Sequence, residues 1–346
     1  MKLTCVSAEL LIYNHLTRIS QQRRRMFQRV KRFLYDLIVW SGIINYLTLL
    51  IRPMLRKIIS KTKSSNYKVV DSSGASMDAT LLQGKVFPPV RTSKILSISG
   101  MRIRKDDAFL CGYPKTGCHW MYEIMQMLTS GRAQLSKQGK ELGGMIDLVP
   151  DIVLDSLPSP RILNSHLHYD ELPKGVKENK TKIVLTVRNP KDTVVSHYNH
   201  HKVMTFMYGY DGKFDDYFEL FMAGKLEFGD YFEHVLSWDR VMKTQNDNPV
   251  LMVSFEDLKA RPVEMVRTVA RFLGKSVTDQ LAEDIVKACD FDVMKEKRKK
   301  EGGVDATMFR KGKVGDWRNW LTDSQSEAID AVWREKMMAC SYQPDY

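Results

Sequence analysis

A glycine-bounded loop is the stretch of this sequence whose residues are best suited to bind a phosphate. Gly112 and Gly117 bracket it with the spacing Gly-x-x-x-x-Gly, and Lys115 lies inside it. An apolar run at 108–111 precedes the loop, and a helical pattern at 120–129 follows it. A strand, such a loop and a helix N-terminus place backbone N–H groups around an anion. The alternative is a glycine-rich turn with one exposed lysine, because short patterns recur by chance.

The residues that follow the loop argue against a metal-bound triphosphate. Cys118 and His119 stand where an ATP- or GTP-binding loop carries Lys and Ser/Thr. That Ser/Thr is the usual Mg²⁺ ligand, and that Lys reaches the β- and γ-phosphates. The loop therefore favours a phosphate bound without a metal. A metal-dependent P-loop phosphoryl transferase stays as an alternative function.

Two further groups of side chains are suited to bind a second phosphate. Arg188 directly follows an apolar run, and Ser196 lies eight residues later. An arginine fork and a serine hydroxyl together can clamp a phosphate. Arg310 and Lys311 precede Gly312, which lets backbone N–H groups approach an anion closely. The alternatives are an arginine that caps a sheet edge and a solvated pair of loop charges.

These motifs, in this order, resemble those of the cytosolic sulfotransferases. Tyr113–Trp120 resembles the 5′-phosphosulfate loop of that family, and Arg188–Tyr198 and Arg310–Trp317 resemble two further motifs. The resemblance covers roughly Arg102 to Cys340. It implies transfer of a sulfuryl group from 3′-phosphoadenylyl sulfate (PAPS) to a hydroxyl or amine of a small apolar acceptor, by in-line displacement without a metal. A non-catalytic nucleotide-binding homologue is a further alternative.

The resemblance also implies the two catalytic residues. His166 matches the general base, a role that suits an imidazole. Lys115 would stabilise the leaving phosphate oxygen. Asn164 replaces the family lysine that contacts the sulfonate region, and His168 replaces a family proline. Without the resemblance, His166 would be interpreted as an ordinary hydrogen-bonded histidine.

The remaining implied contacts belong to the donor nucleotide. Arg188, Ser196 and residues 310–312 match the family's 3′-phosphate site, and Trp120 and Phe291 match the pair that encloses the adenine. Phe255 lacks the hydroxyl of the family tyrosine, a loss of about 1 kcal/mol. Asp290 brings a negative charge near the nucleotide. The full expected set is Lys115, Thr116, Gly117, Cys118, His119, Trp120, Arg188, Ser196, Phe255, Phe291, Met294, Arg310, Lys311 and Gly312.

The elements that must position these residues alternate between strands and helices. Short continuous apolar runs separated by helical patterns predict an α/β fold with a central parallel sheet covered by helices on both faces. Ligands of such sheets bind beyond the carboxyl ends of the strands. The expected strands are 108–111, 161–164, 183–187 and 250–254. The expected helices are 120–129, 193–203, 214–222, 231–244, 262–273, 278–288 and 323–338.

The predicted domains are an N-terminal extension at 1–70, a linker and lead-in at 71–101, and a sulfotransferase domain at 102–342. The extension has 14 Lys and Arg but only two acidic residues, and so carries the whole net charge of +12. Residues 33–51 form an apolar run between basic clusters. A membrane anchor, a membrane-surface helix and a poorly ordered extension all fit this run. It does not fit a secretory signal.

Composition restricts the compartment and the partners. The five cysteines show no paired spacing, which favours a reducing, cytoplasmic compartment. No nucleic-acid-binding module is visible. Residues 318–327 overlap the family's dimer segment, but Asp323 replaces its central valine, which leaves homodimerisation open. The acceptor cannot be identified; Phe87, His168, Tyr169 and residues 204–210 are its candidate pocket.

Overall fold

The fold is described from a computed structural model, in which residues 64–344 are described apart from 137–139, 141–142, 245–247 and 301–308. The described residues belong to one compact unit, Thr62–Tyr346. The apolar run at 33–51 lies outside them, so its membrane association stays a prediction. None of the described helices is long and apolar enough to span a bilayer.

A four-stranded parallel sheet lies at the centre of the unit. Its strands are β4 (Ala108–Gly112), β5 (Ile162–Ser165), β6 (Lys182–Val187) and β7 (Val250–Ser254), in the order β5-β4-β6-β7. Every neighbouring pair is parallel. The four strands coincide with the four apolar runs within one residue at either end, which confirms the predicted sheet.

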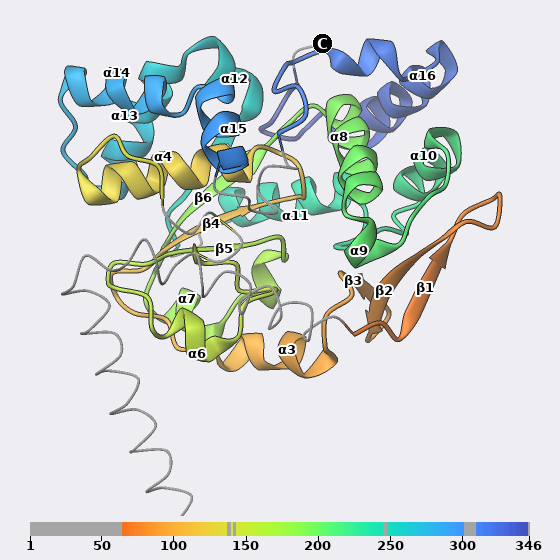
Figure 1. The fold of residues 1–346 in the computed structure, drawn as a ribbon, viewed down its shortest axis with the longest axis horizontal. Helices are drawn as coiled ribbons and strands as arrows, with labels where there is room; N and C mark the ends of the chain where they lie inside the picture. The colour runs from red at the N-terminus through yellow and green to blue at the C-terminus, as the bar shows by residue number, and fades with distance from the viewer. Residues whose placement is uncertain (1–63, 137–139, 141–142, 245–247, 301–308, 345–346) are drawn as a thin grey trace, which may run out of the picture. The chain divides into compact units, whose positions relative to one another are not determined.

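Helices cover both faces of this sheet, because alternate residues of each strand point to opposite sides. Ala108 and Leu110 of β4 pack in one core with α4 (Cys118–Ser130), α13 (Pro262–Leu273) and α14 (Asp279–Ala288). Phe109 and Cys111 pack in a second core with α6 (Asp151–Leu154), α7 (Lys174–Glu178) and α11 (Tyr231–Lys243). Figure 1 shows α4 and α13 on one side of the strands and α6 and α7 on the other. The predicted α/β fold class is confirmed.

The first part of the expected linker and lead-in at residues 71–101 is not a linker. A small antiparallel sheet occupies this part of the chain, with β1 (Tyr67–Val70), β2 (Ser76–Leu82) and β3 (Lys85–Phe87) in sequence order. The Asp71 carboxylate accepts from the N–H groups of Ser73 and Ala75, so the polar run is a hairpin turn. In β2, Met77 and Ala79 alternate with partly exposed residues and are buried in the main core.

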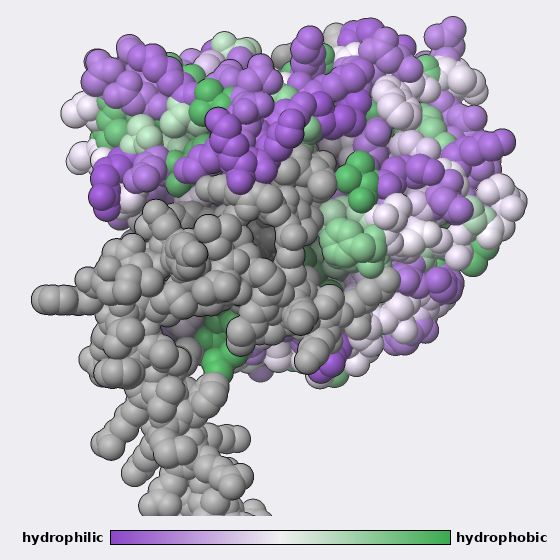
Figure 2. Space-filling view, in the orientation of Figure 1, coloured by the Kyte–Doolittle hydropathy of each residue, from purple (hydrophilic) through white to green (hydrophobic). Residues whose placement is uncertain are grey.

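The remaining elements complete the layers around the sheet. Helix α8 begins at Pro190, three residues before its predicted start, because the Asn189 side chain caps it by accepting from the N–H of Lys191. On the face shown in Figure 2, hydrophilic side chains predominate over α13, α14 and α15. The other helices are α3 (Thr92–Ser97), α8 (Pro190–Val203), α9 (Thr205–Tyr208), α10 (Phe214–Met222), α12 (Phe255–Ala260), α15 (Phe291–Lys300) and α16 (Asp323–Val332).

Candidate active site

The phosphate loop is held in a backbone conformation that requires glycine. Gly112 ends β4 with φ +154°, and a Cβ there would meet the Thr186 hydroxyl at 2.4 Å. Lys115 adopts a left-handed φ of 72°. Helix α4 begins at Cys118, directly after Gly117. The first N–H groups of the helix therefore face the loop, as an anion site requires.

The Thr116 side chain stabilises the loop by hydrogen bonds on its buried side. It is buried, and its hydroxyl donates to the carbonyl oxygen of Tyr113 at 2.7 Å. The same hydroxyl lies 3.0 Å from Oγ1 of Thr186 on β6. Among the predicted catalytic and nucleotide-binding residues, Thr116 alone is not part of the cavity wall described next.

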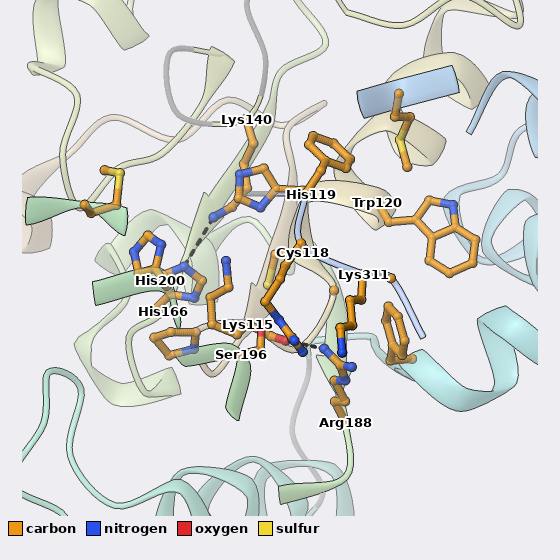
Figure 3. A pocket seen from close by; sticks show the side chains of 18 of the residues that line it. Lys115, Cys118, His119, Trp120, Lys140, His166, Arg188, Ser196, His200 and Lys311 are labelled. Atoms are coloured by element: carbon orange, nitrogen blue, oxygen red, sulfur yellow. Dashed lines mark hydrogen bonds between the residues drawn. The ribbon is translucent and has the colours of Figure 1, made fainter. Parts of the chain in front are cut away.

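One cavity at the carboxyl ends of the strands brings the other predicted site residues together (Figure 3). They come from β-strand ends, helix N-termini and the loop around residue 311, which are far apart in sequence. The predicted residues in its wall are Lys115, Gly117, Cys118, His119, Trp120, His166, Arg188, Ser196, Phe255, Phe291, Met294, Arg310, Lys311 and Gly312.

Arg188 is held rigidly at the end of β6. Its guanidinium lies 4.2 Å from the centre of the Phe255 ring and donates to the carbonyl oxygen of Lys313 at 3.0 Å. Burial lowers the pKa of Arg188, and the carboxylates of Asp192 and Glu256 oppose that change. Its Nε is buried and has no hydrogen-bond partner among the described residues. This donor is therefore available to an anion in the cavity.

The loop at 310–317 is tied to α8. The Asp192 carboxylate accepts from the N–H groups of Gly315 and Trp317, at 2.7 and 3.0 Å. Arg310 and Lys311 each form an ion pair with Asp316, at 2.6 and 2.7 Å. Although burial raises the pKa of Asp316, hydrogen bonds from Lys311, Asn319 and Arg310 hold it at about 2. The expected pair of loop cations thus already shares one carboxylate.

Aromatic side chains form the wall next to these cations. Trp120 meets Phe255 edge to face, with ring centres 5.8 Å apart. A Cβ on Gly312 would meet the Phe291 ring at 2.2 Å, so the absence of a side chain there lets this ring pack against the backbone. Flat apolar walls beside clustered cations suit a nucleotide, whose base stacks while its phosphates pair.

His166 has the hydrogen bonds of a neutral base. Its Nδ1 lies 2.6 Å from the carbonyl oxygen of Gly112. A carbonyl oxygen only accepts, so Nδ1 carries the proton and Nε2 carries the lone pair. Burial lowers the pKa of His166 well below its usual value, and the nearby charge of Lys140 lowers it further. The Asp147 carboxylate fixes the backbone here by accepting from the Ser165 hydroxyl and the His166 N–H.

Lys140 is a site residue that the sequence did not indicate. Its side chain is buried in the cavity wall, and its Nζ lies 3.2 Å from Nε2 of His166 (Figure 3). It stands in a polar segment between α4 and β5 that carries no recognisable motif. Only the fold brings it to the base.

A buried histidine and glutamate cluster was also missed. Glu227 Oε1 accepts from Nε2 of His197 and of His201, at 3.0 and 2.7 Å. Although burial raises the pKa of Glu227, the charges and hydrogen bonds of the two histidines hold it well below its usual value. Among the described residues, these three are the set whose side-chain atoms lie close enough to hold a metal ion. Their mutual hydrogen bonds account for their positions.

The wall near His166 is largely apolar. The ring of Phe228 lies 5.4 Å from that of His166. Of the expected acceptor contacts, Met204, Met207 and Tyr208 are part of the wall, whereas Phe87, His168 and Tyr169 are not. Tyr169 instead donates to the Asn248 side chain. The apolar and aromatic residues of this part of the wall are Pro88, Met145, Leu148, Met204, Met207, Tyr208 and Phe228.

Comparisons of the sequence and of the structure with known proteins all identify sulfotransferases. Residues 105–341 match the family described as the sulfotransferase domain. Sulfotransferase 6B1 of Danio rerio is 32% identical over 267 residues, which cover 75% of this chain and 87% of the relative. Sulfotransferase 1B1 of Mus musculus is 35% identical over 250 residues, covering 67% and 82%. The crystal structure of mouse sulfotransferase SULT7A1 complexed with PAP has 30% identity and a TM-score of 0.66, covering 76% of this chain and 96% of that one.

Proposed function

The chain belongs to the sulfotransferase family and is a sulfotransferase, and we propose that it moves a sulfuryl group from PAPS to a hydroxyl of a small apolar acceptor, with His166 as general base. The observation that carries this proposal is the placement of the His166 lone pair in the same cavity as Lys115 and the phosphate loop. An amine acceptor is the second possibility, since it also loses a proton on attack.

The residues of the cavity fit the donor nucleotide. PAP, adenosine 3′,5′-bisphosphate, is the product that PAPS leaves, and the mouse structure was solved with PAP. The backbone N–H groups of residues 116–119 and Lys115 would hold the 5′-phosphosulfate end. Arg188, with its unpartnered Nε, and Ser196 would hold the 3′-phosphate. Trp120, Phe255, Phe291 and Met294 would enclose the adenine. The donor supplies a sulfuryl group already activated by its bond to phosphate.

His166 and Lys115 act at opposite ends of the transfer. The acceptor hydroxyl loses its proton to Nε2 of His166 as it attacks sulfur. The phosphate oxygen on the other side of the sulfur gains negative charge, which the Lys115 ammonium stabilises. The low pKa of His166 keeps it unprotonated at neutral pH, ready to accept this proton.

The proposed reaction needs no metal. His119 stands where such a loop carries the hydroxyl ligand of Mg²⁺. Cys118 replaces the loop lysine, and its Sγ is buried 3.1 Å from the Thr186 hydroxyl. The alternatives, a metal-dependent phosphoryl transferase and a non-catalytic nucleotide-binding homologue, differ from the proposal in what they bind and turn over. We also propose a cytoplasmic location, because the four described cysteines are unpaired.

Calorimetric titration of the full-length protein tests the donor site. We expect micromolar binding of PAP and no binding of ATP with Mg²⁺. Binding of ATP with Mg²⁺ but not of PAP would favour the phosphoryl transferase. Binding of PAP without turnover of any acceptor would favour the non-catalytic homologue.

A further inference from the structure

Lys140 is a buried cation that faces both the base and the phosphate loop. Its residue exposure is 4%, and it lies in the same cavity wall as Lys115 and His166. Because Nδ1 of His166 is the protonated nitrogen, the 3.2 Å contact is a hydrogen bond from the Lys140 ammonium to the lone pair of Nε2. In this arrangement the Lys140 ammonium is hydrogen-bonded to Nε2 of His166, the nitrogen that must take the proton from the acceptor hydroxyl.

The backbone around Lys140 is anchored to the edge strand of the sheet. Asn164 of β5 donates from its side-chain amide to the carbonyl oxygen of Lys140 at 3.3 Å. The backbone of Asn164 also exchanges hydrogen bonds with Gly144 and Ile146, at 2.8 and 3.0 Å. A Cβ on Gly144 would meet the carbonyl oxygen of Ile162 at 2.2 Å, so the segment lies directly on β5. These contacts hold the stem of Lys140 at the active site.

The ammonium has no paired carboxylate within the described part of the chain. Asp147, a buried carboxylate that interacts with the charge of Lys140, already accepts from the Ser165 hydroxyl at 2.6 Å and from the His166 N–H at 2.9 Å. Buried lysines are rare unless they are paired, because an uncompensated ammonium loses its hydration. A cation in this position therefore favours an anion that arrives from outside the chain.

We propose that Lys140 is a catalytic residue that binds the transferred sulfonate: it holds Nε2 of His166 until the donor binds, then moves to the sulfonate oxygens and frees Nε2 for the acceptor's proton. The inference rests on the proposed function. The sequence supports it independently, because position 164, where the resembling family has a lysine, is Asn164 here. That asparagine instead holds the segment that carries Lys140. Lys140 would therefore supply, from another part of the chain, the positive charge that the family lysine supplies at position 164.

Lys140 acts in the reaction step only through its charge, and every bond that forms or breaks involves other groups. The acceptor oxygen forms a bond to sulfur, and its proton passes to Nε2 of His166. The bond between sulfur and the phosphate oxygen breaks, and its electron pair stays on that oxygen beside Lys115. The ammonium of Lys140 neither gains nor loses a proton, and it stabilises the negative sulfonate oxygens throughout the transfer.

The test compares full-length Lys140→Met with wild type, with Lys140→Arg, and with the surface control Lys287→Met. Methionine keeps the apolar stem and removes the charge. We expect Lys140→Met to lower kcat by on the order of 10²-fold, as for loss of one donor to a developing anion. Affinity for PAP, which has no sulfonate, should stay within about threefold, less than 1 kcal/mol. Lys140→Arg should recover part of the rate, and Lys287→Met should match wild type.

The pH profile separates this role from a purely structural one. Loss of the positive neighbour raises the pKa of His166, so the acid limb of kcat/KM should move to higher pH in Lys140→Met. A rate within twofold of wild type with an unmoved acid limb would overturn the proposal. Equal losses of PAP affinity and rate would also overturn it. If wild type neither binds PAP nor turns over, the proposed function fails instead.

A measurement on the wild-type protein covers the case in which Lys140→Met does not fold. The ¹⁵N NMR signals of labelled histidines report the state of His166 Nε2. We expect PAPS, added without an acceptor, to shift this signal because Lys140 leaves it, and PAP to shift it much less. Equal responses to the two nucleotides would show that Lys140 does not follow the sulfonate.

Discussion

Nδ1 of His166 lies 2.6 Å from the carbonyl oxygen of Gly112, the residue at which β4 passes into the phosphate loop. This hydrogen bond fixes the tautomer of the base and ties its ring to the loop that holds the donor. The two sequence motifs are thus coupled through one backbone atom. A displacement of the loop would therefore misorient the His166 ring. The position of the donor and the orientation of the base depend on the same backbone segment.

Replacement of His166 by alanine should separate binding from catalysis. We expect kcat to fall by at least ~10²-fold, since general-base catalysis contributes about that much. The affinity for PAP should be unchanged, because the imidazole does not contribute to the phosphate sites. Turnover assays and PAP titrations on the same preparation check both. Unchanged turnover in His166→Ala would remove this histidine from the mechanism.

The pH dependence of activity should reflect the buried state of His166. Burial and then the charge of Lys140 lower the pKa of His166, with smaller contributions from His234 and His119. The base is active when unprotonated, so activity is lost only when the pH falls below this lowered pKa. We expect the acid limb of kcat/KM to lie below pH ~6.5, the ordinary histidine value. An acid limb above that value would contradict the assignment of Nε2 as a buried base.

Replacement of Gly312 by alanine should weaken the nucleotide site. The new Cβ would meet the Phe291 ring at 2.2 Å, so the ring must leave its place in the cavity wall. We expect roughly tenfold weaker PAP binding, equivalent to about 1.4 kcal/mol. Gly84→Ala is the matched control, because Gly84 also has a positive φ, of 77°, but has open space around it. Similar PAP affinities in the two variants would show that the Phe291 ring does not need this position.

The Glu227 cluster should make the protein sensitive to acid. Burial lowers the pKa of His197, although the Glu227 carboxylate opposes this change. Glu227, despite its burial, is kept charged by its two histidine partners, which hold its pKa below the usual value. Both groups bind more protons in the unfolded chain, so stability is complete above pH ~6.5 and falls as the pH drops through the unfolded values of first histidine and then glutamate.

Glu227→Gln tests the energetic part of this account. The amide keeps the shape of the side chain but removes the charge that accepts from His197 and His201. We expect the free energy of unfolding at pH 7 to drop by about 3 kcal/mol, as when one member of a buried charged network is lost. Urea unfolding at pH 7 and pH 5 gives the values. A variant as stable as wild type at pH 7 would show that this network is energetically neutral.

The sheet and most of the site could be predicted because their signals are local. Each central strand is a continuous apolar run, and the residues at the strand ends carry the motifs. The three-stranded sheet at 67–87 was not predicted because Asp71 and its neighbours look like a linker. The inward turn of the Thr116 side chain depends on Thr186, seventy positions along the chain. No local pattern contains that contact.

Lys140 and Glu227 show the second limit of the sequence. Neither belongs to a motif, and each gains its role from partners on other elements, His166 after β5 and the histidines of α8. A lysine in a polar segment is usually solvated. This one is buried, and its backbone is held by the side chain of Asn164 on β5. The roles of Lys140 and Glu227 depend on contacts between distant parts of the chain, which no local sequence pattern contains.

Transfer of ³⁵S from labelled PAPS tests the central claim most directly. The full-length protein would be incubated with EDTA and a panel of phenols, steroid alcohols and fatty alcohols, beside His166→Ala. We predict that label moves to at least one hydroxyl acceptor with wild type, without added metal, and at least ~10²-fold more slowly with the variant. Label that stays in PAPS with every acceptor, while PAP binds normally, would contradict catalysis. Equal transfer by His166→Ala would contradict the base on which the proposed mechanism depends.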